Sequence, residues 1–409
     1  MRIPSVTSIR RISLLIVLLA ACRGASPSAQ TLNQSQLAIL VDSLMPGVAK
    51  AAGLEFKSTP KSAVRTKEQI HVYLTAKMAR DLPENRVEGI TATYRLLNML
   101  PDSVDLRKLF LELYTEQIVG FYDPDSTTLF AVQGGDAGQL RLVLSHELAH
   151  ALQHQYVPLD SILHDATDGD RQTAAQAVME GQATLVSLIA MFPTMNIRTD
   201  DGFWETFREQ LRKQQFDTTV YGRAPMAIRE GLTFPYVGGA DFVRAFDKTH
   251  PGKVPFGALL PKSTEQLLHA DRYAAGDLPI AIRFHGDTTG VIFEDTFGEF
   301  DIELLRAQLI GAKEVRTDPA IGWGGDRFRI YRTPDGPALV WLTVWDEPRW
   351  AVQFRSQVAE PLATKPRPGY KTTTEPQLLG GKSAVRIVIA PVGWTGWKSL
   401  PGAEIASSP

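Results

Sequence analysis

The sequence predicts an α+β protein in which a mostly helical domain with a small β-hairpin or sheet precedes a small α+β C-terminal domain. Three observations support this class. Apolar residues recur at helical spacing up to about Glu116, two short strand-like segments follow, and the composition shifts again near Gly290. At 409 residues the chain exceeds one ordinary domain, so we predict a main domain over residues 37–289 and an accessory domain over 290–409.

The first 36 residues are predicted to lie outside the fold. A basic start precedes an apolar run from Ile12 to Ala21, which is too short to span a bilayer as a mature helix and is typical of an export signal. The run ends in Leu19-Ala20-Ala21-Cys22, which resembles the bacterial lipobox, whose cysteine is lipidated. We therefore expect a lipoprotein signal peptide over residues 1–21, a lipid on Cys22 and a flexible tether over 22–36. The alternative is a plain signal peptide with a chance cysteine.

Charge and cysteine content exclude two further features. The formal net charge is −2, so no broad electrostatic field favours nucleic acid as a partner. Cys22 is the single cysteine, so no internal disulfide can form, although export would permit one.

The main domain is predicted to begin with helices. Leu37, Leu40, Val41 and Leu44 have helical spacing, and a capping box at Thr66 is expected to begin a second helix. Further helices are expected from about Val87 to Leu100 and from Leu106 to Glu116.

A β-hairpin is predicted next. Ile118–Tyr122 and Thr128–Val132 are strand-like, and Asp123-Pro124-Asp125-Ser126 between them has turn chemistry. This hairpin could offer an edge strand to an extended peptide. A helix from about Leu140 to Gln155 should follow the double glycine at Gly134-Gly135.

The accessory domain is predicted from weaker patterns. The segment Ala274–Thr289 is rich in loop residues and is expected to end the main domain, and Gly322–Asp326 is expected to be a loop. Strands fit Arg327–Tyr331, Ala338–Trp345 and Ala384–Ile389, and two helices fit residues 303–310 and 349–358. No cluster of His or Glu in this domain suggests chemistry.

The chemistry is predicted to lie in His146-Glu147-Leu148-Ala149-His150. A helix places residues four apart on one face, with Cβ atoms roughly 5–6 Å apart, so His146 and His150 can bind one Zn²⁺ together. Zinc lowers the pKa of a bound water towards about 7, and Glu147 beside the first histidine could take its proton as general base. The neighbouring apolar residues predict a buried helix, on which these polar groups need partners. The alternative is a pair of histidines that are satisfied without a metal.

Glu180 is the preferred third ligand. It lies on a helix predicted from Arg171 to Met191, after a polar loop from Pro158 to Asp170. Ala174, Ala177 and Gly181 form a strip of small residues that would let a second helix approach closely. His154 is a weaker candidate, because a straight helix carries it away from the metal. The alternative for Glu180 is a solvated surface residue.

These residues resemble the gluzincin peptidases, the group that includes thermolysin and the aminopeptidase N type. There a glutamate on a second helix completes a His, His, Glu site, and the aminopeptidases carry a Glu-Gly-x-Ala segment that Glu180-Gly181-Gln182-Ala183 matches. Their Pro-Tyr-x-x-Gly segment, whose tyrosine stabilises the transition state, is matched by Pro235-Tyr236-Val237-Gly238-Gly239, ahead of a helix expected from Gly239 to Lys248. The resemblance implies a zincin-like fold and a catalytic role for Tyr236. The alternative is a packed core tyrosine.

The chain departs from those enzymes in three ways. The interval between His150 and Glu180 is longer, and Thr184 stands where thermolysin has an aspartate four residues after its ligand glutamate. Asp168 or Asp170 could replace that aspartate as the partner of a ligand histidine. No aminopeptidase substrate motif precedes the zinc helix. Together with Gly120–Pro124 and Ser263–Gln266, the pattern is similar to uncharacterised bacterial gluzincin-like proteins.

The preferred interpretation is a zinc metallopeptidase, most simply an endopeptidase, with one zinc per chain. Its lipidated cysteine would anchor it to a membrane, facing the periplasm or the cell surface. Its partners would be a peptide or protein substrate and the membrane. Two alternatives are a non-catalytic zinc-binding lipoprotein that acts as a binding or assembly scaffold, and a zinc hydrolase of a non-peptide substrate.

Overall fold

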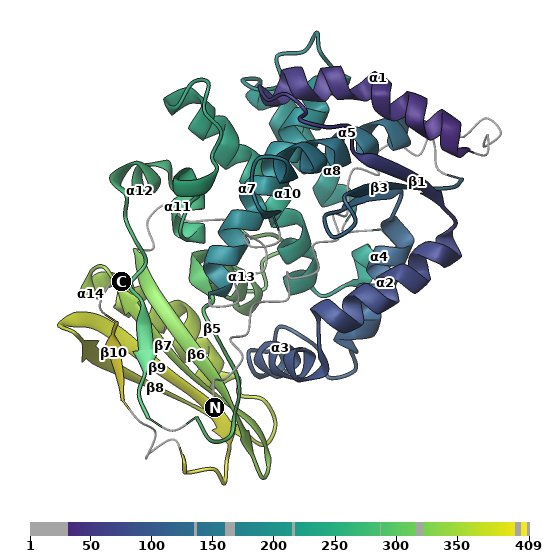
Figure 1. The fold of residues 1–409 in the computed structure, drawn as a ribbon. Helices are drawn as coiled ribbons and strands as arrows, with labels where there is room; N and C mark the ends of the chain where they lie inside the picture. The colour runs from purple at the N-terminus through teal and green to yellow at the C-terminus, as the bar shows by residue number, and fades with distance from the viewer. Residues whose placement is uncertain are drawn as a thin grey trace.

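The computed structural model describes residues 32–134, 137–159, 168–214, 217–286, 288–315, 322–396 and 402–406. The chain is α+β, as predicted: helices dominate its first part and a five-stranded sheet with helices forms its last part (Figure 1). The predicted signal peptide, Cys22 and most of the tether lie outside the described residues. Within the described ranges, no helix combines the length and the apolar character that crossing a bilayer requires.

The first part is built from helices around a small three-stranded sheet. Its elements are α1 (Gln34–Ala52), β1 (Lys61–Arg65), α2 (Lys67–Asp81), α3 (Glu84–Leu96), α4 (Leu106–Gln117), β2 (Gly120–Asp123), β3 (Thr128–Val132), α5 (Ala137–His154), α7 (Gly169–Met191), α8 (Asp201–Gln214), α9 (Val220–Arg223), α10 (Met226–Thr249), the 3₁₀ turn η2 (Gly257–Leu259), α11 (Thr264–Leu268) and α12 (Ala270–Ala275).

The predicted hairpin is present, and a third strand extends it. β2 and β3 pair antiparallel, and β1 pairs parallel with β3, which gives the strand order β1-β3-β2. β1 was not predicted, because its sequence Lys61–Arg65 alternates polar and apolar residues only weakly. β2 therefore lies at one edge of this sheet, next to α5.

The predicted tether over residues 22–36 is too long by three residues. α1 begins at Gln34, because Asn33 accepts a hydrogen bond from the backbone N–H of Gln36 while the Gln36 side chain accepts one from the backbone N–H of Asn33. These two bonds satisfy donors that an uncapped helix end leaves free.

Helices α7 and α10 cross with their backbones almost in contact. A Cβ atom on Gly239 would lie 1.7 Å from the carbonyl oxygen of Ala177, and one on Gly181 would lie 2.0 Å from the carbonyl carbon of Gly239. The predicted small-residue strip does permit a close helix approach, and the helix it meets is α10. Figure 1 shows the two helices side by side at the centre of the first part.

The helix expected from Gly239 to Lys248 is longer than predicted, since α10 begins at Met226. Pro235 lies inside it, although proline removes a backbone hydrogen bond and usually ends a helix. The buried Phe234, Tyr236, Gly239 and Ala240 around it pack into the core, so tertiary packing outweighs that local cost.

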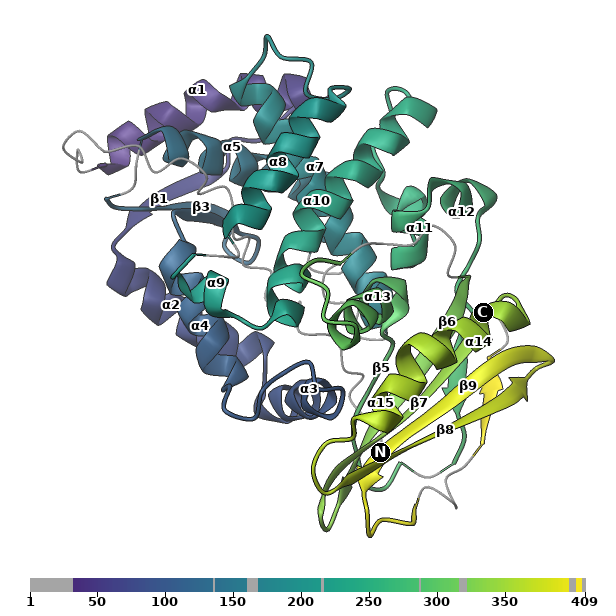
Figure 2. The ribbon, with the colours of Figure 1, turned by 180° about the vertical axis from the view of Figure 1, so that it is seen from behind.

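The last part is an antiparallel sheet with helices on one face, as Figure 2 shows. Its strand order is β5-β6-β7-β9-β8, and a separate short pair joins β4 to β10. The elements are β4 (Ile282–Phe284), β5 (Val291–Asp295), α13 (Gly298–Leu309), β6 (Trp323–Thr333), β7 (Gly336–Trp345), α14 (Pro348–Phe354), the π-helical turn η3 (Arg355–Ala359), α15 (Glu360–Thr364), β8 (Tyr370–Leu379), β9 (Lys382–Pro391) and β10 (Ala403–Ile405).

Two expected loops in this region contain strands. Gly322–Asp326 was expected to be a loop, but β6 begins at Trp323 and passes through a bulge between Trp323 and Gly325. A side chain at Gly325 would lie 2.3 Å from the carbonyl oxygen of Ile280, so glycine is required there by close backbone approach. The segment Ala274–Thr289 likewise contains β4.

The two parts share one hydrophobic core. Phe234 on α10 stacks on Phe300 of α13 with ring centroids 3.8 Å apart, within a buried cluster that includes residues of both parts. The N-terminus of α7 is also held across this junction. The backbone N–H of Gly169 donates to Asp295 of β5 at 2.8 Å. Within the first part, Asp170 accepts from the backbone N–H of Thr264 of α11 at 3.1 Å.

Candidate metal and active site

The predicted ligand residues converge. His146 and His150 lie on α5, and Glu180 lies near the middle of α7. The two Nε2 atoms are 3.0 Å apart, and Glu180 Oε2 lies 3.2 Å from Nε2 of His146 and 3.5 Å from that of His150. All three side chains are buried.

The spacing of the three atoms suits one tetrahedral metal ion. Ligand atoms that each lie about 2.0–2.1 Å from a tetrahedral zinc are roughly 3.3–3.4 Å from one another. The observed separations of 3.0, 3.2 and 3.5 Å bracket that value. Two imidazole nitrogens and one carboxylate oxygen form a donor set that zinc prefers, and three protein ligands leave one position for water or substrate.

The protonation states favour a cation at this point. Burial lowers the pKa of His146 to about 4, so its imidazole is neutral at pH 7 and offers a lone pair. Burial opposes ionisation of Glu180, but hydrogen bonds with His146 and His150 hold its pKa below the usual value. A lone pair on Nε2 of His146 that faces the Glu180 carboxylate is costly in a buried site unless a positive charge lies between them.

Glu147 is positioned beside this cluster by β2. Its Oε2 accepts a hydrogen bond of 2.8 Å from the backbone N–H of Tyr122, and its Oε1 is buried without a hydrogen-bond partner among the described residues. Burial raises the pKa of Glu147 well above its ordinary value. One oxygen of this side chain is therefore fixed and the other is available to exchange a proton with a reacting group. This contact uses one of the backbone N–H groups of β2 that point away from β3.

Tyr236 lies against the first ligand. Its ring stacks on His146 with centroids 5.8 Å apart and an interplanar angle of 28°. It stands one turn before Gly239, so the close approach of α7 and α10 also brings its ring to the histidine. The structure thus brings all five predicted residues of the chemistry together: His146, Glu147, His150, Glu180 and Tyr236.

The weaker candidate for the third ligand does not join the cluster. His154 Nδ1 is 2.9 Å from the hydroxyl of Tyr122 and is not in the group of residues that could hold a metal.

The prediction that Asp168 or Asp170 partners a ligand histidine is wrong. Asp168 caps the N-terminus of α7 and accepts from the backbone N–H of Arg171. Asp170 accepts from Thr264. Both lie at least ten residues before Glu180 on a continuous helix, which corresponds to about 15 Å.

The partner of His150 was not predicted. Gln153 Oε1 lies 2.8 Å from Nδ1 of His150. Its position, three residues after His150 on the same helix face, was a signal that could have identified it.

A second acidic group is already neutralised. Glu265, Asp277 and Asp346 lie close enough to share an ion, but Arg272 bridges Asp277 at 2.6 Å and Asp346 at 2.8 Å. The oxygen atoms of those two aspartates therefore face a guanidinium, and this group does not call for a metal.

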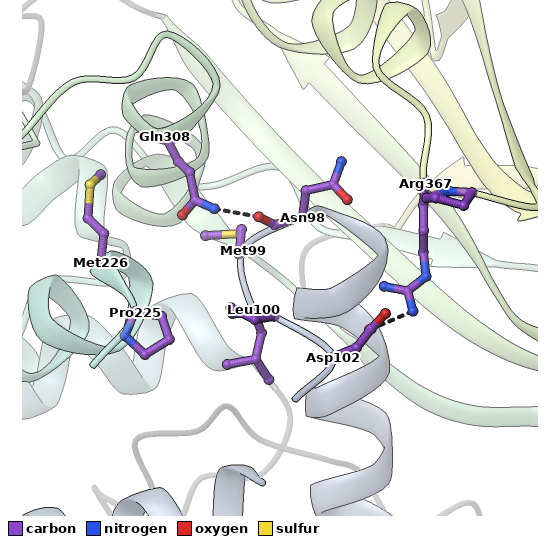
Figure 3. Close-up of a pocket in the computed structure, with 10 residues that line it drawn as sticks. Asn98, Met99, Leu100, Asp102, Pro225, Met226, Gln308 and Arg367 are labelled. Carbon is purple, nitrogen blue, oxygen red and sulfur yellow. Dashed lines mark hydrogen bonds and ion pairs between the residues drawn. The ribbon is translucent and has the colours of Figure 1, made fainter. Parts of the chain in front are cut away.

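A cavity of about 540 Å³ lies at the junction of the two parts, away from the ligand cluster. Figure 3 shows its lining, where Arg367 pairs with Asp102 and the Gln308 amide donates to the Asn98 carbonyl. None of the five predicted residues of the chemistry contributes to it.

Comparison with known proteins adds one finding. A family described as "Domain of unknown function (DUF8575)" matches residues 287–388, which include β5 to β8 and most of β9. No curated protein and no solved structure matches the chain. The matched family covers the sheet with its helices and does not include the ligand cluster.

Proposed function

We propose that this protein is a zinc-dependent peptidase, with His146, His150 and Glu180 as metal ligands in a zincin-like main domain. The observation that carries the proposal is the set of three buried ligand atoms 3.0–3.5 Å apart, with Glu147 beside them. Zinc held there would polarise a peptide carbonyl and lower the pKa of water.

The residues of the chain have separate roles in this proposal. Glu147 accepts the proton of the attacking water through Oε1 and later delivers it to the leaving amine, because its other oxygen is held by Tyr122. A raised pKa favours the protonated carboxyl, which suits the step in which Glu147 delivers a proton to the leaving amine. The hydroxyl of Tyr236 donates a hydrogen bond to the carbonyl oxygen that gains negative charge as water attacks.

Two alternatives remain distinct from this proposal. A zinc-binding lipoprotein that acts as a scaffold needs the three ligands but has no use for a buried glutamate with an available oxygen, so Glu147 favours an enzyme. A zinc hydrolase of a non-peptide substrate would use the same residues. We prefer a peptide as substrate because the residue pattern resembles that of peptidases.

The test is a peptide-library cleavage assay with the protein freed of its first 24 residues, with and without a chelator. We expect internal cleavage that the chelator abolishes and added zinc restores. Zinc binding without cleavage of any peptide would support the scaffold, and cleavage that resists the chelator would reject the metal mechanism.

The anchor is proposed separately. Because the apolar run ends at Cys22, we expect the mature protein to carry lipid on that residue. Cys22→Ser should abolish labelling by a fatty-acid analogue in a bacterial host. Unchanged labelling, or a mature chain that begins at another residue, would contradict the lipoprotein proposal.

A further inference from the structure

We propose that Gln153 is a positioning residue for the metal centre, which fixes His150 in the tautomer whose Nε2 lone pair faces the metal. This inference rests on the proposed function, because it requires that the centre binds zinc. It goes beyond the three ligands and assigns a role to the side chain behind the second one.

The orientation of the Gln153 amide follows from its partners on α7. Its Nε2 lies 2.9 Å from the carbonyl oxygen of Met179 and 2.9 Å from Oε1 of Gln182. A backbone carbonyl can only accept a hydrogen bond, so the group that faces Met179 must be the NH₂ of the amide. The oxygen of Gln153 is therefore the atom that faces His150.

The tautomer of His150 follows in turn. Oε1 of Gln153 lies 2.8 Å from Nδ1 of His150, and an amide oxygen can only accept, so this nitrogen carries a hydrogen. In a neutral imidazole the other nitrogen then has a lone pair. That nitrogen, Nε2, points at the Nε2 of His146 and at Glu180.

The same side chain also joins the two helices that carry the ligands. Gln153 lies on α5 and is 2% exposed, and its partners Met179 and Gln182 flank Glu180 on α7. One amide therefore sets both the orientation of His150 and the separation of that histidine from Glu180. Partners of this kind contribute about 10–100-fold to metal affinity.

A purely structural role for Gln153 predicts a different result. In that case its replacement would lower the free energy of unfolding of the metal-free protein and leave the affinity of the folded site for zinc unchanged. Measuring both quantities separates the two roles.

The experiment compares zinc affinity, by competition with a chromogenic chelator, in the full chain and in four variants. We expect Gln153→Leu to weaken zinc binding by about 10–100-fold. Gln182→Leu should weaken it less, because Met179 still orients the amide. Gln153→Glu should lie between Gln153→Leu and the parent, because a carboxylate still accepts from Nδ1 of His150 but cannot donate to Met179 and Gln182. Gln155→Leu is the matched control, since Gln155 follows α5 and contacts Lys57 and Ser58 but no ligand; it should bind like the parent.

A second measurement keeps the result independent of stability. The visible spectrum of the Co²⁺-loaded protein should change in Gln153→Leu and stay as in the parent in Gln155→Leu. Parent-like zinc affinity and cobalt spectrum in Gln153→Leu would overturn the proposal. If that variant does not fold, Gln182→Leu and Gln153→Glu decide: zinc binding weaker than in the parent in either variant supports the role, and parent-like affinity in both overturns it. A parent that binds no zinc would instead reject the metal site itself.

Discussion

Buried carboxylates lie at two places along helix α7, near its N-terminus and near its middle. The two sets differ in their hydrogen-bond partners. At the N-terminus, Asp170 and Asp295 accept hydrogen bonds from Thr264 and from the backbone N–H of Gly169. Behind them Asp326 accepts two backbone N–H groups and two indole N–H groups, from Phe297, Gly298, Trp323 and Trp341.

In the middle of the helix the polar atoms face one another. Glu180 lies close to the Nε2 atoms of His146 and His150, and the cluster offers it no other hydrogen-bond donor. His146 Nδ1 and Glu147 Oε1 are buried without a hydrogen-bond partner among the described residues. Buried polar groups are normally paired, and a group that is left unpaired calls for a missing partner or a chemical role. The comparison teaches that burial alone does not identify a site: the carboxylates of the N-terminal junction have hydrogen-bond donors, whereas the central cluster keeps unpaired atoms, which we propose that a cation completes.

The largest effect is expected from Glu147→Gln. The amide keeps the shape and the contact with Tyr122 but cannot take a proton, so turnover should fall by at least about 10²–10⁴-fold with zinc retained. Steady-state kinetics and zinc content check this. Near-normal cleavage by the variant would remove Glu147 from the mechanism.

A smaller effect is expected from Tyr236→Phe. The ring can still stack on His146, but no hydroxyl remains to stabilise developing charge, so turnover should fall on the order of 10²–10³-fold. KM and zinc content should stay close to those of the parent. Full activity, or loss of the fold, would mean that the tyrosine is structural.

Tyr236 also shows what sequence reasoning could and could not predict. His146, Glu147 and His150 follow from local spacing on one helix, and the strip of small residues before Gly181 indicated a close helix crossing. Which helix it meets depends on long-range packing, and so does the survival of Pro235 inside α10.

The error about Asp168 and Asp170 has a similar origin. Their acidity suggested partners for a histidine, but both lie at the N-terminal end of α7, where Asp168 caps the helix and Asp170 accepts from Thr264 of α11. The start of strand β6 was not predicted, because Gly324 and Gly325 are typical of a loop. Their close contacts with Ile280 explain why glycine stands there.

The smallest effect is expected at the carboxylates near the N-terminus of α7. Burial raises the pKa of Asp295 from its ordinary 3.8 to about 7, so between these values the folded protein holds a proton that the unfolded chain releases. The free energy of unfolding should therefore fall as pH rises through this window. Since one pKa unit corresponds to about 1.4 kcal/mol, the change should exceed about 1 kcal/mol.

Asp295→Asn removes this titration, so its free energy of unfolding should depend less on pH than that of the parent. Urea unfolding of the chelated proteins at pH 5 and pH 8 measures the difference. Asp335→Asn, at the exposed turn between β6 and β7, is the control and should follow the parent. Parallel pH profiles for parent and Asp295→Asn would contradict the role assigned to burial here.

The most direct test of the central claim is to measure the zinc bound per chain when a residue of either carboxylate site on α7 is replaced. Elemental analysis after dialysis should give one zinc per chain for the parent, for Asp170→Asn and for His154→Ala. Glu180→Ala should hold none, because in the part of the chain that the structure describes only Glu180 completes the cluster with His146 and His150. A parent without zinc, or a Glu180→Ala variant that keeps one zinc while His154→Ala loses it, would contradict the account.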